Sequence, residues 1–284
     1  MKVLITGAGG QLGHDLIRVL QDEHEVTAYK RIELDITQFS KVSEVITQDR
    51  PDVIVHAAAF TNVDRAQIDR DAAYQVNATG AWHVAAVASQ IGAKVVYVST
   101  DYVFNGTKRE AYRETDQVSP VSVYGASKLY GEQFTQLLCP QSYIVRTSWL
   151  YGASGSNFVT KVLAHAASHR KLTMVDDQFG SPTYTLDLAI WIAALIQTNK
   201  YGLYHVSNRG SCSRYEFART ILDHYGLSDV PITPIATAPA PHVAPRPHYS
   251  VFDDEAIRVQ ELPRMRVWSE ALRDFLENDW QGTS

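Results

Sequence analysis

Short apolar runs alternate with longer segments of helical periodicity through the first half of the chain. The runs lie at Lys2–Thr6, Glu25–Tyr29, Val53–His56 and Lys94–Ser99. After the first run, apolar residues at Leu12, Leu16 and Leu20 fall on one helix face. Strands alternating with helices predict an α/β fold, a doubly wound parallel sheet whose ligands bind at the carboxyl ends of the strands.

The same periodicities predict further elements along the chain. We expect a third strand edge at Glu33–Ile36 and a long helix over about Asp71–Ile91. In the second half we expect strands at Tyr143–Ser148 and Leu203–Val206 and a helix at Ser213–Tyr225. The second half is therefore expected to supply a smaller lobe beside the sheet.

Composition narrows the class of protein. The chain has 284 residues with 26 basic and 31 acidic side chains, and a net charge of −5 does not indicate a nucleic-acid surface. The only cysteines, Cys139 and Cys212, are too few for a disulfide framework. The apolar stretch Leu186–Ile196 contains Asp187 and is too short to cross a membrane, and no secretion signal is found. We expect a soluble, cytoplasmic protein.

A glycine-rich turn follows the first predicted strand. Gly7 permits a tight turn, Gly10 lets the backbone approach a pyrophosphate, and Gly13 lets helix and strand pack closely. Gln11 and Leu12 complete the turn. A strand-to-helix turn can use glycines without binding any ligand, but a position opening a βαβ unit favours a dinucleotide site.

Basic residues follow the second predicted strand. Folds that select NAD place an acid there for the ribose hydroxyls, whereas this chain has Lys30 and Arg31. Two cations suit a 2′-phosphate, so we predict NADPH, with NADH as the alternative cofactor; the pair could also only solvate a loop. Asp35, followed by Ile36, is placed to meet the adenine amino group.

The third buried strand ends in small side chains. Ala57, Ala58 and Ala59 leave room for a cofactor to pass. His56, just before them, is expected to be a hydrogen-bonded core histidine rather than a catalytic group.

A tyrosine and a lysine stand four residues apart at the start of a predicted helix. Tyr124 and Lys128 therefore share one face, and a fixed positive charge would lower the pKa of the phenol. Such a tyrosine can exchange a proton with a carbonyl or alcohol oxygen. An isolated pair of this kind is usually an ordinary surface pair. Here Thr100 and Asp101 fall on the same rim of the sheet, which favours a catalytic group.

The glycine turn, the Thr100 strand end and Tyr124-x-x-x-Lys128 together resemble the extended short-chain dehydrogenase/reductase family. Further stretches are similar to one branch of it, the dTDP-4-dehydrorhamnose reductase family. These are Gly10–Gly13, Pro51–Ala59, Ser99–Phe104, Arg146–Tyr151 and Asp177–Thr183.

The resemblance implies an activity and roles for the rim residues. An NADPH hydride would be delivered to the C4 ketone of a dTDP-bound 6-deoxy sugar, yielding dTDP-L-rhamnose for polysaccharide biosynthesis. Tyr124 would donate the proton, Lys128 would lower its pKa and hold the nicotinamide ribose, and Thr100 would hydrogen-bond the reacting oxygen. Donors aimed at the oxygen where negative charge develops agree with this chemistry.

The resemblance also implies a substrate pocket, to which Asp101 would belong. Trp149 is a candidate sugar or base platform, or else a core aromatic. Asn157 would meet the substrate. Arg246, within Ala244–Pro247, would pair with the diphosphate, or else be a structural loop arginine. The family tends to have an asparagine where this chain has Tyr249, so this loop departs from its pattern.

Domain limits and a metal complete the expectations. We expect an NADP-binding Rossmann domain over residues 1–150 and a mainly substrate-binding lobe over 151–284, with some segments returning to the first domain. Some family members bind Mg²⁺ at a dimer interface through glutamates. The matching residues here are the shorter Asp15 and Asp187. Carboxylates suit Mg²⁺ but isolated acids are usually solvated surface, so Mg²⁺ is allowed and not predicted, and a homodimer is allowed.

Two other functions use the same residues. A sugar-nucleotide epimerase or dehydratase with bound NAD shares the Tyr-Lys pair, and Asp101 stands where a dehydratase needs an acid. The lack of an acid after the second strand and the short substrate lobe argue against it. A non-catalytic regulatory subunit, as in relatives that bind methionine adenosyltransferase, also uses this fold.

Overall fold

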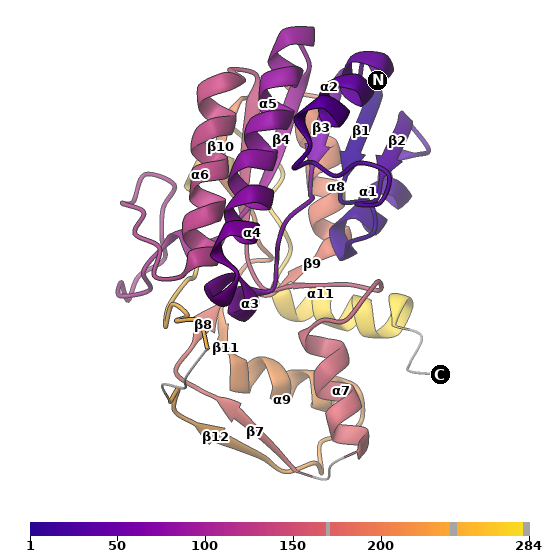
Figure 1. The fold of residues 1–284 in the computed structure, drawn as a ribbon. Coiled ribbons are helices and arrows are strands. Elements are labelled where there is room, and N and C mark those ends of the chain that lie inside the picture. Colours follow the sequence, from indigo (N-terminus) through magenta and orange to yellow (C-terminus); the bar gives the residue numbers. More distant parts are fainter. Residues whose placement is uncertain (169–170, 239–242, 281–284) are drawn as a thin grey trace.

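A six-stranded parallel sheet forms the larger part of the molecule. The computed structural model describes residues 1–168, 171–238 and 243–280, and the strand order is β10-β5-β4-β3-β1-β2 (Figure 1). All five pairings are parallel, so the predicted doubly wound fold is confirmed. The strands are β1 (Lys2–Thr6), β2 (Glu25–Tyr29), β3 (Val53–His56), β4 (Lys94–Thr100), β5 (Ser142–Thr147) and β10 (Gly202–His205).

Helices cover both faces of this sheet because its central strands are apolar on both sides. On one face lie α1 (Gln11–Leu20) and α8 (Thr185–Ile196), whose Leu16 and Ile192 share a core with Val55. The other face carries α2 (Phe39–Asp49), α5 (Gly80–Ile91) and α6 (Val123–Leu138). The connecting helices are α3 (Val63–Ile68), α4 (Arg70–Tyr74), η1 (Gln75–Thr79), η2 (Asp101–Val103) and α10 (Glu255–Val259).

A smaller lobe lies beside the carboxyl ends of the strands, at the bottom of Figure 1. Its core includes Tyr151, Tyr184, Phe217 and Phe275, all fully buried. Helix α9 begins at a capping box in which Ser213 and Glu216 satisfy each other's backbone amides. The lobe contains α7 (Phe158–Ser168), α9 (Arg214–His224), α11 (Trp268–Asp274), η3 (Phe275–Asp279) and short strands β6 (Leu150–Tyr151), β7 (Leu172–Val175), β8 (Phe179–Gly180), β9 (Thr183–Tyr184), β11 (Cys212–Ser213) and β12 (Ile232–Ile235).

Two segments from the second half belong to the layers of the sheet. Strand β10 pairs with β5, and α8 packs beside α1. The division of the chain at residue 150 remains a prediction. Within the three described ranges, no helix is both long and apolar enough to cross a membrane.

Two sequence-based expectations differ from the structure. The strand edge predicted at Glu33–Ile36 is wrong, because the Asp35 carboxylate accepts hydrogen bonds from the Thr37 backbone and hydroxyl and closes a turn. The helix predicted over Asp71–Ile91 contains a π-helical segment, η1, in its middle.

Candidate active site

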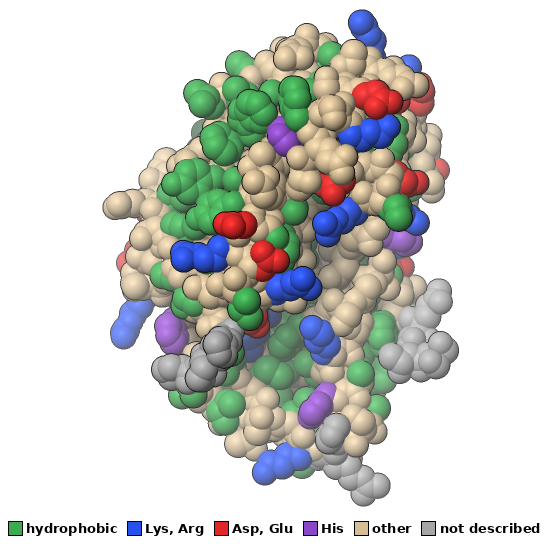
Figure 2. Space-filling view, viewed as in Figure 1, with side chains coloured by type: hydrophobic (Ala, Val, Ile, Leu, Met, Phe, Trp, Pro, Cys, Tyr) green, Lys and Arg blue, Asp and Glu red, His purple; other side chains and the backbone are tan. Residues whose placement is uncertain are grey.

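A cleft of about 1380 Å³ opens at the carboxyl ends of the strands, between the sheet and the smaller lobe. Figure 2 shows this hollow with basic side chains around it. Lys30 is not part of its lining and lies against Gly9 instead. The predicted site residues that line it are Gly7, Gly10, Gln11, Leu12, Gly13, Arg31, Asp35, Ile36, Ala57, Ala58, Ala59, Thr100, Asp101, Tyr124, Lys128, Trp149, Asn157 and Arg246.

The glycine turn forms a cradle at the switch point between β1 and β3. Gly7 has a φ of 76°, and a Cβ on it would lie 2.6 Å from the Ala58 amide nitrogen. A Cβ on Gly13 would lie 2.8 Å from Ala8 Cα. No side chain caps α1 at Gly10, so its first amide groups remain for an anion. These features fit the pyrophosphate of a dinucleotide.

The far end of this cradle carries Arg31 and Asp35. Burial alone would raise the pKa of the Asp35 carboxyl, but the hydrogen bonds from Thr37 hold it below its usual value. Ile36 is buried, and its carbonyl is bonded to the His83 ring. The Asp35 side chain is thus already engaged within its own turn, and its predicted contact with adenine stays a prediction.

Thr100, Tyr124 and Lys128 meet where β4 ends and α6 begins. The side chains of Tyr124 and Thr100 are hydrogen-bonded to each other. The Lys128 ammonium donates to the Val98 carbonyl at 2.6 Å and lies 4.0 Å from the centre of the Tyr97 ring. Lys128 is therefore held against β4, one helical turn from Tyr124.

Burial controls the ionisation of these groups. It lowers the pKa of Lys128 to about 7, with the Glu132 carboxylate opposing the shift. Burial raises the pKa of Tyr124 above its usual value, against the effect of the Thr100 hydrogen bond. The expected lowering of the Tyr124 pKa is therefore wrong, because desolvation disfavours the phenolate. Desolvation also lowers the fraction of Lys128 that is protonated near neutral pH, and so reduces the charge that would stabilise the phenolate. A protonated phenol remains a proton donor.

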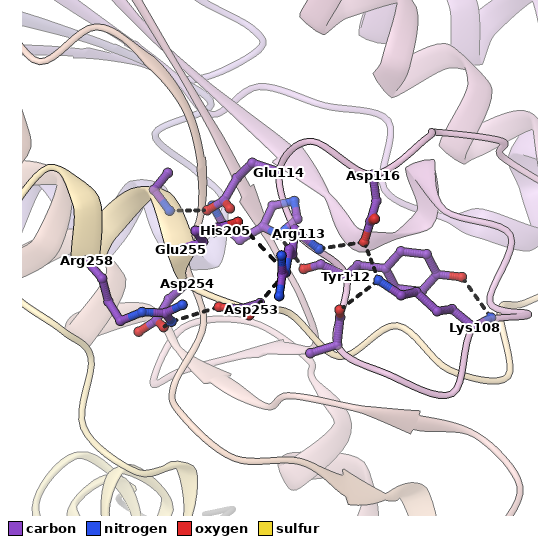
Figure 3. A network of polar contacts seen from close by, with 12 residues as sticks. Lys108, Tyr112, Arg113, Glu114, Asp116, His205, Asp253, Asp254, Glu255 and Arg258 are labelled. Atoms are coloured by element: carbon purple, nitrogen blue, oxygen red, sulfur yellow. Dashed lines mark hydrogen bonds and ion pairs between the residues drawn. The ribbon is translucent and has the colours of Figure 1, made fainter.

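Figure 3 shows the polar network that fixes the loop between Thr100 and Tyr124. Lys108 forms an ion pair with Asp116 at 2.7 Å. The Glu114 carboxylate accepts from the backbone amides of His205 in β10, at 3.1 Å, and of Ala256 in α10, at 3.3 Å. The loop that joins β4 to α6 is therefore anchored to the edge of the sheet.

The smaller lobe contributes Trp149 and an arginine that the sequence reading missed. Trp149 has a φ of 48°, and a Cβ on Gly180 would lie 2.6 Å from its ring nitrogen. The Arg214 guanidinium stacks 3.4 Å from the centre of the Trp149 ring and lines the cleft. The one signal in the sequence was its place after Ser213, at the start of α9.

The other predicted substrate residues already have partners within the chain. The Asn157 amide donates to the Gly152 carbonyl at 2.8 Å and accepts from Thr160 at 3.1 Å. Arg246 makes a two-pronged ion pair with Asp64, at 2.9 and 3.0 Å. Their contacts with substrate stay predictions.

Asp101 lies beside Thr100 and is fully enclosed. Its carboxylate accepts from the Ser250 hydroxyl at 2.6 Å and from the Thr100 hydroxyl at 3.1 Å. Burial nonetheless raises its pKa to about 6.

The two aspartates matched to a metal site in other family members have different surroundings. Asp187 is neutralised by Arg266, with both contacts at 2.8 Å, whereas buried Asp15 accepts from Thr185. Among the described residues, no group of three or more His, Cys, Asp or Glu could hold a metal ion. Nothing here supports Mg²⁺.

The parallel sheet, its glycine cradle and the Thr100, Tyr124 and Lys128 group define an oxidoreductase of the short-chain dehydrogenase/reductase class. A family model described as the RmlD substrate binding domain matches residues 1–280. The chain therefore belongs to the RmlD substrate binding domain family.

Curated relatives and solved structures agree with this membership. The chain is 44% identical over 277 residues to the spore coat polysaccharide biosynthesis protein SpsK of Bacillus subtilis, covering 97% of each. It is 41% identical over 287 residues to a dTDP-4-dehydrorhamnose reductase of Aggregatibacter actinomycetemcomitans, covering 96% of this chain and 98% of the relative. A crystal structure of dTDP-4-dehydrorhamnose reductase from Bacillus anthracis in complex with NADP matches with a TM-score of 0.93 and 44% identity, over 97% of this chain and 98% of that one.

Proposed function

We propose that this protein is an NADPH-dependent reductase that converts dTDP-4-dehydro-L-rhamnose to dTDP-L-rhamnose in nucleotide-sugar biosynthesis. One observation carries the proposal. The hydrogen-bonded Thr100 and Tyr124 side chains line the same cleft as Lys128, and reduction of a ketone requires a proton donor there. The names of the relatives supply the substrate.

The chemistry follows from how these groups are held. A bound nicotinamide supplies the hydride that adds to the C4 carbon of the ketone. Tyr124, whose raised pKa keeps it protonated, donates a proton to the C4 oxygen. The Thr100 hydroxyl, which donates to Asp101 in this structure, would turn to donate to the same oxygen. Lys128, when protonated, stabilises the negative charge left on Tyr124.

The preference for NADPH over NADH rests on charge at the end of β2. Arg31 lines the cleft there, and Lys30 lies beside Gly9 in the glycine turn. Guanidinium and ammonium groups suit the 2′-phosphate of NADPH, whereas NADH offers only ribose hydroxyls.

A redox-neutral epimerase or dehydratase is the second candidate. The observation that favours it is the acid Asp101, placed beside Thr100. The UDP-glucose 4-epimerase of Thermus thermophilus matches with a TM-score of 0.84 at 19% identity, which shows a common fold alone. Both Asp101 oxygens already accept hydrogen bonds, so we favour a structural role for this carboxylate.

The test measures NADPH oxidation at 340 nm with dTDP-4-dehydro-L-rhamnose. We expect oxidation in proportion to product, and a fall in kcat of about 10²–10⁴-fold in Tyr124→Phe without a change in NADPH affinity. Tyr130→Phe, at a half-exposed tyrosine on the same helix, is the matched control and keeps full activity. Turnover without net NADPH oxidation favours the epimerase or dehydratase. NADPH binding with no turnover of any keto-sugar favours a regulatory role.

A further inference from the structure

Arg214 differs from several other arginines of the chain in how its charge is matched. Arg146, Arg246 and Arg266 each form ion pairs with carboxylates, whereas across residues 1–168, 171–238 and 243–280 Arg214 forms none. Its guanidinium lies against two aromatic rings, 3.4 Å from the centre of Trp149 and 5.2 Å from that of Phe158. A cation that lines a cleft and forms no ion pair within these ranges is a candidate anion site.

The surroundings of Arg214 remain positive. The Tyr102 hydroxyl is hydrogen-bonded to both Arg214 and Arg246. Lys161, in the first turn of α7, lines the same cleft. The nearby acids are occupied, because Asp64 is paired with Arg246 and Asp101 accepts from Ser250 and Thr100. Burial lowers the pKa of Arg214, against the opposing effects of Tyr102 and Asp101.

We propose that Arg214 anchors the diphosphate of the nucleotide-sugar substrate. This inference rests on the proposed function and adds a residue to it. Stacking on Trp149 fixes the plane of the guanidinium, which is hydrogen-bonded to the neutral Tyr102 hydroxyl, and its fork matches two phosphate oxygens. The amino end of α7, beside Phe158, adds a favourable dipole.

The position of Arg214 also suits the reaction. Arg214 interacts electrostatically with Asp101, the residue that directly follows Thr100 in the chain. Thr100 and Tyr124 line the same cleft as Arg214, so a diphosphate held at Arg214 lies in the same site as the reacting groups. Arg246, whose charge is already matched by Asp64, remains the predicted second contact.

The experiment is calorimetric titration of dTDP and of thymidine into the protein saturated with NADP⁺. For Arg214→Gln we expect dTDP affinity to fall about 10–100-fold, because charge-assisted hydrogen bonds are lost, and thymidine and NADP⁺ affinities to stay unchanged. Arg214→Lys should recover part of the loss, since it restores the charge without the fork. The control is Arg273→Gln, at an exposed arginine of α11 outside the cleft lining.

The outcomes separate this inference from the proposed function. Steady-state kinetics of Arg214→Gln should show the loss mainly in the KM for the dTDP-sugar, with kcat largely kept. If Arg214→Gln binds dTDP as tightly as the wild type, the inference about Arg214 is overturned and the proposed function still stands. This holds even if the KM for the whole dTDP-sugar rises, because Arg214 would in that case contact the sugar and not the diphosphate. A wild-type protein that binds NADP⁺ but not dTDP overturns the proposed substrate itself.

Discussion

Replacing Gly131 by alanine tests how closely α6 packs on the rest of the site. A Cβ at this position would overlap the Tyr97 hydroxyl and the Asn77 carbonyl, and would lie 2.6 Å from Tyr97 Cζ. The Tyr97 hydroxyl donates to that carbonyl at 3.0 Å. The substitution therefore forces α6 away from Tyr97 and η1.

The magnitude follows from three contributions. Glycine to alanine within a helix stabilises by about 1 kcal/mol. Overpacking a core costs about 1–3 kcal/mol, and loss of the buried Tyr97 hydrogen bond costs about 1 kcal/mol more. We expect a net loss of about 1–3 kcal/mol, which lowers Tm by roughly 2–10 °C in a chain of this size. Because Lys128 lies 4.0 Å from the Tyr97 ring, kcat should also fall, by about 10-fold or more.

Thermal unfolding and steady-state kinetics, the latter well below Tm, measure the two effects separately. The control is Gly92→Ala at the end of α5, where φ is 74° and no atom lies within 4 Å of the added Cβ. It should lose about 1 kcal/mol through backbone strain and keep its kcat. A Gly131→Ala protein as stable as the wild type, or an equal loss of kcat in both variants, would refute the packing argument.

Three further predictions concern buried charge and the cofactor. Burial lowers the pKa of His56 from 6.5 to about 3, so between pH 6.5 and 3 the unfolded chain binds more protons than the folded one, and the free energy of unfolding falls as pH drops. In urea unfolding, the free energy of unfolding of His56→Asn should depend less on pH than that of the wild type. An equal pH dependence in the two proteins would contradict this prediction. Glu132→Gln leaves the buried Arg146 unpaired and should cost about 3–5 kcal/mol in urea unfolding, against less than about 1 for the exposed Glu44→Gln. Arg31→Ala should raise the KM for NADPH about 10-fold and leave that for NADH unchanged, and equal rises would exclude 2′-phosphate recognition.

Periodicity and turn chemistry predicted the parts of the fold that depend on local sequence. The strands at Lys2–Thr6, Glu25–Tyr29 and Val53–His56 have the predicted bounds, because apolar runs between turn residues favour buried parallel strands. The prediction of a strand edge at Glu33–Ile36 was wrong because a local turn closed by Asp35 competes with strand pairing. The spacing of apolar residues does not show which of the two forms.

The site was predictable where strand ends determine it and not where distant segments meet. Thr100 and Tyr124 could be assigned to one rim because parallel strands end on one side. The pairing of Arg246 with Asp64 and the stacking of Arg214 on Trp149 join residues far apart in the chain, so no local pattern signals them. The direction of the Tyr124 pKa shift depends on burial, which emerges only after folding.

The place of β10 at the edge of the sheet also governs when the protein can fold during its synthesis. One edge of β5 stays unpaired until β10, which ends at His205, has left the ribosome. Helix α1 likewise stays uncovered until α8 has been synthesised. Until then the nascent chain exposes an unpaired apolar strand edge, a known route to misassembly. A fragment ending near residue 150 should aggregate for the same reason, because it lacks both β10 and α8.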